Sequence, residues 1–123
     1  MKREAKFNTT FNHWLKHVYK RTAAFELKQT EGNSIPFSSV VEHQRNALLQ
    51  VRHACLVYKI PDVGFQNPFD TLEMCEQPAY IAIKYPKGVA IIPIDAFLLE
   101  EKRSKRKSLT WDRAKAISTI EFK

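Results

Sequence analysis

Two apolar runs separated by three residues constrain the fold of this chain most strongly. Residues 79–85 (AYIAIKY) and 89–94 (VAIIPI) have the length and composition of strands, and Pro86-Lys87-Gly88 lies between them. A short connection that contains Pro and Gly between two such runs is typical of a hairpin. We therefore expect two strands here, joined by a tight turn.

Helical patterns flank the remaining strand-like runs. Residues 3–20 carry apolar side chains at spacings of three and four, which predicts an amphipathic helix with this inward stripe: Phe7, Phe11, Trp14, Leu15 and Val18. Ser39 and Glu42 have capping-box spacing, so we expect a second helix up to about Arg52. On it Val41, Leu48 and Val51 are expected to face inward, and Arg45, Gln50 and Arg52 outward.

Shorter segments complete the expected order α-β-α-β-β-β-β-α, which is a mixed α/β fold. Strands are expected at residues 22–29, 54–60 and 69–74, with loops at 31–36 and 61–68. The run 54–60 is nearly continuously apolar. Residues 95–101 are expected to be helical or irregular, and Thr110 is a candidate N-cap for a last short helix.

The length of 123 residues fits a single domain, 1–123, with one core. No apolar run reaches the length of a membrane span, and the N-terminal residues lack the pattern of a signal peptide. Cys55 and Cys75 match no metal-binding spacing, so we expect reduced structural thiols in a cytoplasmic protein.

The charge is strongly basic and unevenly distributed. The formal net charge is +7, the pI is about 9.5, and residues 102–107 hold five cations. Such a surface either contacts a polyanion or serves only solubility; we expect DNA as the partner. The residues expected to contact nucleic acid are Lys2, Arg3, Lys6, Lys16, His43, Lys102, Arg103, Lys105, Arg106 and Lys107.

A carboxylate and an ammonium occur two residues apart in the strand expected at 22–29. On a strand, Glu26 and Lys28 project from one face, and Phe25 and Leu27 from the other. A carboxylate can hold a divalent cation, and a neighbouring ammonium can orient water or stabilise a charged phosphate. These are requirements of phosphodiester hydrolysis, although Glu-x-Lys alone is common by chance.

Three other side chains are candidates for the same site. Glu4 falls on the apolar stripe of the first helix, where it either favours the helix N-terminus or points into a site. Asp70 is expected on the apolar face of the strand 69–74. Gln44 lies along the core edge of the second helix, where it either satisfies a backbone group or contacts a water or phosphate of the site.

Taken together, these residues resemble the PD-(D/E)XK nucleases, and within them the RecU-type Holliday junction resolvases. The matching features are Phe-Glu-Leu-Lys-Gln-Thr at 25–30, Ile-Pro-Phe at 35–37, and Glu-His-Gln at 42–44 opening a helix before an apolar strand. The resemblance covers about a third of the chain. It implies a restriction-endonuclease-like mixed sheet flanked by helices, dependence on Mg²⁺ or Mn²⁺, and a homodimer that cuts branched DNA in a bacterial or phage-infected cell.

The chain departs from this family pattern at one acid. The family places an aspartate on a strand upstream of Glu-x-Lys, and residues 19–24 contain none. Asp70 is the expected replacement, with Asp62 second, so that Asp70 and Glu26 would hold the metal while Lys28, Gln44 and Glu4 assist. A nuclease is therefore expected, and a nucleic-acid-binding module without catalysis or a small interaction protein remain as alternatives.

Overall fold

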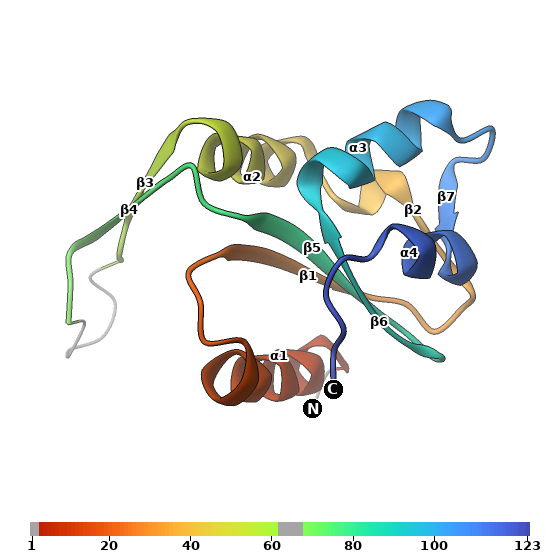
Figure 1. Cartoon of the computed structure of the whole chain (residues 1–123), viewed down its shortest axis with the longest axis horizontal. Helices are drawn as coiled ribbons and strands as arrows, with labels where there is room; N and C mark the ends of the chain where they lie inside the picture. The colour runs from red at the N-terminus through yellow and green to blue at the C-terminus, as the bar shows by residue number, and fades with distance from the viewer. Residues whose placement is uncertain (1–2, 62–67) are drawn as a thin grey trace.

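A three-stranded mixed sheet organises the fold of this chain (Figure 1). The computed structural model describes residues 3–61 and 68–123, the side chains of residues 3–5 excepted. Strand β1 (Ala24–Gln29) lies at one edge and runs parallel to the central strand β5 (Ala79–Tyr85). Strand β6 (Gly88–Pro93) pairs antiparallel with β5, so the predicted hairpin is confirmed.

Gly88 closes this hairpin in a conformation that side chains rarely adopt. Its φ angle is +158°, and a Cβ atom built on it would lie 2.9 Å from the Trp111 ring. Both the backbone and the close approach of the indole therefore require glycine at this position.

Helices cover both faces of the sheet and make three layers (Figure 1). Helix α1 (Arg3–Trp14) and the π-helical turn η1 (Leu15–Tyr19) pack on one face. Helices α2 (Glu42–His53) and α3 (Ile94–Arg103) pack on the other, where the larger apolar core forms. The alternation along each strand divides the sheet between the two cores, as in Ile81 and Ala82 of β5, and the mixed α/β prediction is confirmed.

The apolar stripe of the first helix is confirmed except at its end. Phe7, Phe11 and Trp14 are buried and Leu15 is half-buried, but Val18 is 58% exposed. The helix widens to a π-helical turn at Leu15–Tyr19, which rotates later side chains away from the stripe that α-helical spacing predicts.

The start of α2 differs from the expected capping box. Residues Phe37–Ser39 form the 3₁₀ turn η2, and the Ser39 hydroxyl donates to the Pro36 carbonyl instead of capping the helix. Val41 is the N-cap and is 42% exposed, so its expected inward position is wrong. The expected outward position of Arg45 is also wrong, because its guanidinium donates to the carbonyls of Val40 and Phe37.

Strands β3 (Cys55–Lys59) and β4 (Thr71–Cys75) form a separate antiparallel ribbon that extends from the body of the molecule (Figure 1). The apolar character of 54–60 favoured a packed strand, yet Val57 is 63% exposed. The pairing register places Cys55 directly opposite Cys75, and the two form a disulfide. The expectation of reduced thiols is therefore wrong in this structure.

The remaining elements form around the far end of the sheet. Strands β2 (Ser34–Pro36) and β7 (Ser108–Thr110) pair antiparallel, a contact that the loop and linker composition did not predict. Thr110 caps helix α4 (Trp111–Ile117) by accepting a hydrogen bond from the Arg113 backbone, as predicted. Across the described residues, the helices fall short of the length and apolar character that crossing a bilayer requires.

Candidate catalytic site on an edge strand

Glu26 and Lys28 project from the same face of β1, as the alternation predicted. Lys28 Nζ lies 3.6 Å from Glu26 Oε1, and the two side chains are 17% and 27% exposed, respectively. Phe25 and Leu27 pack on the opposite face against the core beneath α1. Since β1 is an edge strand, this charged pair lies at the margin of the sheet and not in its centre.

Gln44 connects this pair to helix α2. Its Nε2 donates to Glu26 Oε1 at 3.0 Å, while its Oε1 accepts a hydrogen bond from the Val41 backbone at 3.2 Å. Of the two roles considered from the sequence, the side chain performs the backbone one and also contacts the candidate carboxylate. Because both ends of its amide are engaged, Gln44 fixes the position of Glu26 relative to the first turn of α2.

A cleft of about 330 Å³ opens between β1 and α2 beside this carboxylate. His43 is exposed and lines it together with Gln44, and the rest of the wall is mostly apolar. The lining residues are Ala24, Phe25, Glu26, His43, Gln44, Ala47, Leu48, Val51 and Leu56. A hollow that combines apolar walls with a few convergent polar groups is a typical ligand site.

The structure does not bring Asp70 into this site. Asp70 is exposed and precedes β4, where its carbonyl accepts a hydrogen bond from the Ile60 amide. This is the end of the ribbon opposite to Cys75, about 16 Å away along the strand at about 3.3 Å per residue. The expected apolar face for Asp70 is thus wrong, because the ribbon packs its faces against little of the core. Asp62 lies outside the described residues.

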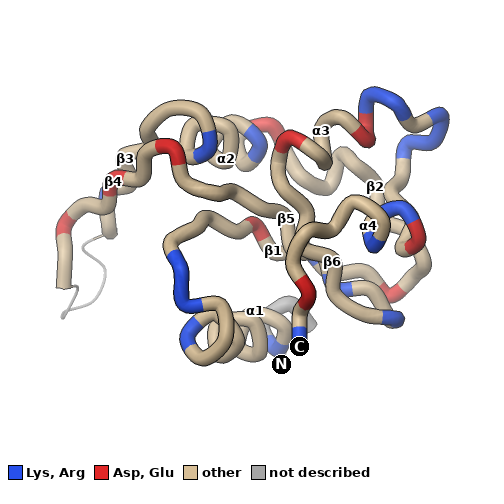
Figure 2. Tube along the Cα trace, in the orientation of Figure 1, with Lys and Arg blue, Asp and Glu red and all other residues tan. Residues whose placement is uncertain are grey.

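Glu4 lies in the first turns of α1, and its side chain is outside the described part of the chain. Lys2 and the Arg3 side chain are likewise outside it. The other cations expected to contact nucleic acid are exposed: Lys6, Lys16, Lys102, Arg103, Lys105, Arg106 and Lys107. Figure 2 shows the last five gathered at the end of α3 and in the connection to β7, away from the β1 edge.

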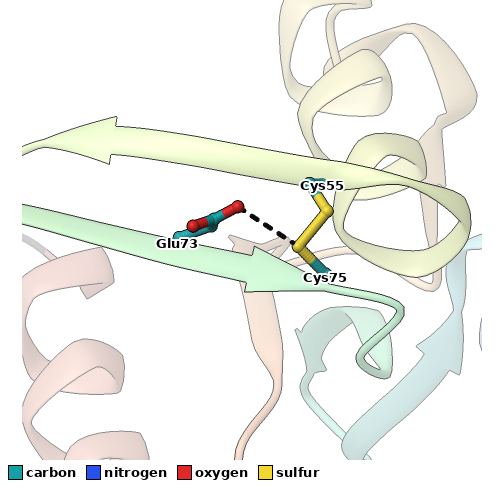
Figure 3. A group of neighbouring side chains, drawn as sticks. All are labelled: Cys55, Glu73 and Cys75. Atoms are coloured by element: carbon teal, nitrogen blue, oxygen red, sulfur yellow. Dashed lines mark hydrogen bonds between the residues drawn. A yellow bond between two sulfur atoms is a disulfide. The ribbon is translucent and has the colours of Figure 1, made fainter.

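Among the described residues, one group of three metal-ligating side chains comes together, and it does not include Glu26. Cys55, Glu73 and Cys75 meet at the base of the ribbon (Figure 3). The Glu73 carboxylate lies 3.6 Å from Cys75 Sγ. The two sulfur atoms are bonded to each other, so they carry no proton and are not thiolate ligands in this state.

Two groups of residues near the site were missed by the sequence reasoning. Arg45 follows Gln44 and forms a bidentate pair with Glu101, 56 residues later in the chain. No local sequence pattern predicts that Arg45 pairs with an acid so distant in the chain. Tyr80 and Arg21 line a groove on the α1 side of the same sheet edge. Arg21 belongs to the basic N-terminal residues considered for nucleic-acid contact, but neither it nor Tyr80 was assigned to a site.

Comparison of the chain with protein-family models, with curated proteins and with solved structures finds no match.

Proposed function

We propose that this chain is a metal-dependent endodeoxyribonuclease with a restriction-endonuclease-like fold and its catalytic centre at the β1 edge. The observation that supports this most directly is the arrangement of Glu26 between Lys28 and Gln44. A half-buried carboxylate, an ammonium 3.6 Å away and an amide from the next helix meet beside an open cleft. Restriction-endonuclease-like sites use these residue types from a strand and the following helix, in agreement with the resemblance described above.

Lys28 is the residue that would contact the scissile phosphate in this proposal. Its ammonium is a point charge with three donors, which suits the orientation of a water molecule and stabilisation of the charge that develops on the phosphate. Glu26 holds the ammonium in place, and Gln44 fixes Glu26 through a hydrogen bond of 3.0 Å. Gln44 is thus a positioning residue, and Glu26 and Lys28 are the catalytic pair.

The residues of the cleft offer a hard divalent cation one carboxylate, which is the smallest number of carboxylates that commonly holds such an ion. Mg²⁺ is commonly held by one or two carboxylates together with waters and substrate phosphates. Glu26 would supply one carboxylate, while Asp70 is placed elsewhere. The chemistry supplied by bound Mg²⁺ or Mn²⁺ is neutralisation of phosphate charge and acidification of water.

The proposed substrate is DNA, and the proposed assembly is a homodimer. The net charge of +7 supports a polyanionic partner, and the exposed cations of residues 102–107 suit phosphate contacts that fix position without reading sequence. Branched DNA and two paired cuts follow from the resemblance alone. The cytoplasm of a bacterial or phage-infected cell is the setting in which this activity would operate.

A nucleic-acid-binding module without catalysis is the second candidate. It is favoured by the position of Asp70, because the carboxylate expected to join Glu26 lies at the far end of an exposed ribbon. Such a module would keep the basic surface and lose the metal-dependent reaction.

Cleavage of a labelled four-way junction tests the proposal. The junction and a matched linear duplex are incubated with Mg²⁺, with Mn²⁺ or with chelator, and with wild type, Glu26→Gln or Lys28→Met. Metal-dependent cuts that fall at least about 100-fold in both variants are expected, since groups acting on the reacting phosphate typically contribute 10²-fold or more.

Glu42→Gln is the matched control, because it removes one exposed carboxylate from the first turn of α2. It is expected to cut at close to the wild-type rate. Asp70→Asn is also expected to retain activity if Glu26 acts without it. Binding of both DNAs without cleavage under any metal condition would refute the nuclease and leave the binding module.

A further inference from the structure

A second hollow lies on the α1 side of the same sheet edge. This groove has a volume of about 960 Å³ and runs between η1, the start of β5 and the C-terminal residues 119–121. Its lining includes Trp14, Tyr19, Arg21, Tyr80 and Glu121. It therefore combines aromatic rings with a cation, which is the combination that binds unpaired nucleotides.

The aromatic side chains form a connected wall. The rings of Trp14 and Tyr19 are stacked with centroids 5.4 Å apart, and Tyr80 stacks on Phe25 at the same distance. Tyr19 and Tyr80 are half-buried, so part of each ring stays open to the groove. Burial, and then the neighbouring Tyr80 hydroxyl, raise the pKa of Tyr19 above its ordinary value.

The polar groups of the groove favour an anionic ligand that can accept hydrogen bonds. Arg21 is exposed and lines the groove, and it follows Lys20, whose left-handed conformation ends η1. Among the described residues of the lining, the one acid is Glu121, whose carboxylate lies 3.6 Å from the ammonium of Lys123; both side chains are more than 70% exposed, so solvent screens this pair. Among the described residues the Nε1 of Trp14 has no hydrogen-bond acceptor, but the atom is buried and is not exposed to a ligand in the groove.

The groove and the Glu26 cleft meet at one strand end. Ala24 pairs with Ala79 in the sheet, and the Ala24 amide donates to the Pro78 carbonyl at 3.0 Å. Ala24 lines the cleft on the α2 side, and Pro78 lines the groove on the α1 side. A strand that leaves the cleft around this end of the sheet would therefore enter the groove directly.

We propose that this groove binds a single-stranded segment of nucleic acid next to the candidate catalytic cleft. Arg21 contacts a phosphate, and the rings of Tyr19 and Tyr80 stack on bases. The position of this segment relative to the cleft rests on the proposed nuclease function, whereas binding in the groove does not. If both hold, the substrate class is DNA with an unpaired strand at the cleavage site.

Binding of a labelled twelve-nucleotide oligothymidylate, followed by fluorescence anisotropy in chelator, tests the groove without catalysis. Arg21→Glu is expected to weaken binding at least about tenfold, and Tyr80→Leu by about tenfold, since stacking on one aromatic side chain typically contributes that much. Tyr80→Phe retains the ring and is expected to bind within about twofold of wild type.

Lys87→Glu is the matched control for charge. It changes the net charge by the same amount as Arg21→Glu, and Lys87 is exposed in the turn between β5 and β6, outside the residues that line the groove. Equal weakening by the two charge reversals, or no weakening by Arg21→Glu, would overturn the proposal. Arg21 is exposed, so this comparison holds even if Tyr80→Leu fails to fold.

The indole resonance of Trp14 gives an independent reading. The chain has two tryptophans, and Trp111→Phe assigns their Nε1–H signals in an NMR spectrum. Addition of oligothymidylate is expected to shift the Trp14 signal and to leave the Trp111 signal in place. A shift at Trp111 alone would place the strand elsewhere and refute the groove.

The two proposals fail in different assays. Oligothymidylate binding that depends on Arg21 but no cleavage with any metal would remove the nuclease and keep the groove. Cleavage that depends on Glu26, together with oligothymidylate binding that is unchanged by Arg21→Glu, would keep the nuclease and remove the groove.

Discussion

Replacement of Arg45 by methionine is the sharpest test of how the candidate site is held in place. The side chain is 19% exposed and lies between three elements. Its Nε donates to the Val40 carbonyl at 2.7 Å, its Nη2 donates to the Phe37 carbonyl at 2.7 Å, and the guanidinium also forms a bidentate pair with Glu101 of α3. Arg45→Met removes all of these donors, and the Phe37 carbonyl then keeps the hydrogen bond from the Val40 amide at 3.2 Å.

The expected loss of unfolding free energy is about 3 kcal/mol. Each charged hydrogen bond to a carbonyl contributes about 1.5 kcal/mol, and the two of them set most of the value. The pair with Glu101 is discounted to less than about 1 kcal/mol, because the acid is 36% exposed. Packing of methionine on the Phe97 ring, which lies 5.6 Å from the guanidinium carbon, offsets part of the loss.

Urea denaturation measures this difference, and a fall in Tm of roughly 10 °C should accompany it. Arg45→Lys keeps the charge but not the planar fork, so we expect it to lose about 2 kcal/mol. Arg52→Met, at an exposed position of the same helix, is expected to stay within about 0.5 kcal/mol of wild type. If Arg45→Met falls within about 1 kcal/mol of Arg52→Met, the reasoning about the Arg45 network is wrong.

Three further predictions concern the frame around the site. Gly88→Ala should destabilise by more than about 1 kcal/mol in thermal melts, because its Cβ would meet the Trp111 ring; an unchanged Tm would contradict this. The Arg113 hydrogen bond lowers the pKa of Glu100 below 4.5, so its stabilisation is present above that pH and disappears as pH falls through the lowered pKa; Glu100→Gln should lose stability at neutral pH and match wild type in strong acid. Reduction of the Cys55–Cys75 disulfide, which closes a separation of 20 residues, removes at most about 3 kcal/mol; amide exchange should quicken within the ribbon and stay slow in β5.

The parts of the fold that the sequence predicted are those fixed by local pattern. The hairpin of β5 and β6, the presence of helix α2 up to about residue 52 and the Thr110 cap depend on spacing and turn chemistry within a few residues, although the capping box expected at Ser39 did not form. The strand alternation also placed Glu26 and Lys28 on one face correctly. In each case neighbouring residues carry the whole signal, so the feature can be predicted without knowledge of the tertiary contacts.

The errors come from contacts between distant segments. Strand β3 in the apolar run at 54–60 pairs with β4, and within it Leu56 is half-buried against the core beside α2. The other residues of β3 are exposed, because the described ribbon extends beyond the body of the molecule. The register of that ribbon decides whether Cys55 meets Cys75, and neither cysteine spacing nor composition encodes it. The helical period predicts that Arg45 faces solvent, but Phe37 of η2 and Glu101 of α3 accept its hydrogen bonds, and the helical pattern encodes neither contact. The prediction that Asp70 joins the Glu26 site is not borne out by its position for the same reason, because a strand pattern does not indicate which sheet the strand joins.

The place of Glu26 at an open sheet edge links the two proposals. In the described sheet β1 has a neighbour on one side, where β5 lies, and the hairpin that would carry an upstream acid has no counterpart in residues 19–24. The starts of β1 and β5 border the cleft on one face of the sheet and the aromatic groove on the other. A site with one carboxylate depends more on substrate phosphates to complete the coordination of a cation. Groups that hold the strand near Glu26, such as Arg21 and Tyr80, should therefore affect metal affinity in the DNA complex as well as DNA affinity. Arg21→Glu should raise the Mg²⁺ concentration needed for half-maximal cleavage, and an unchanged requirement would separate the groove from the site.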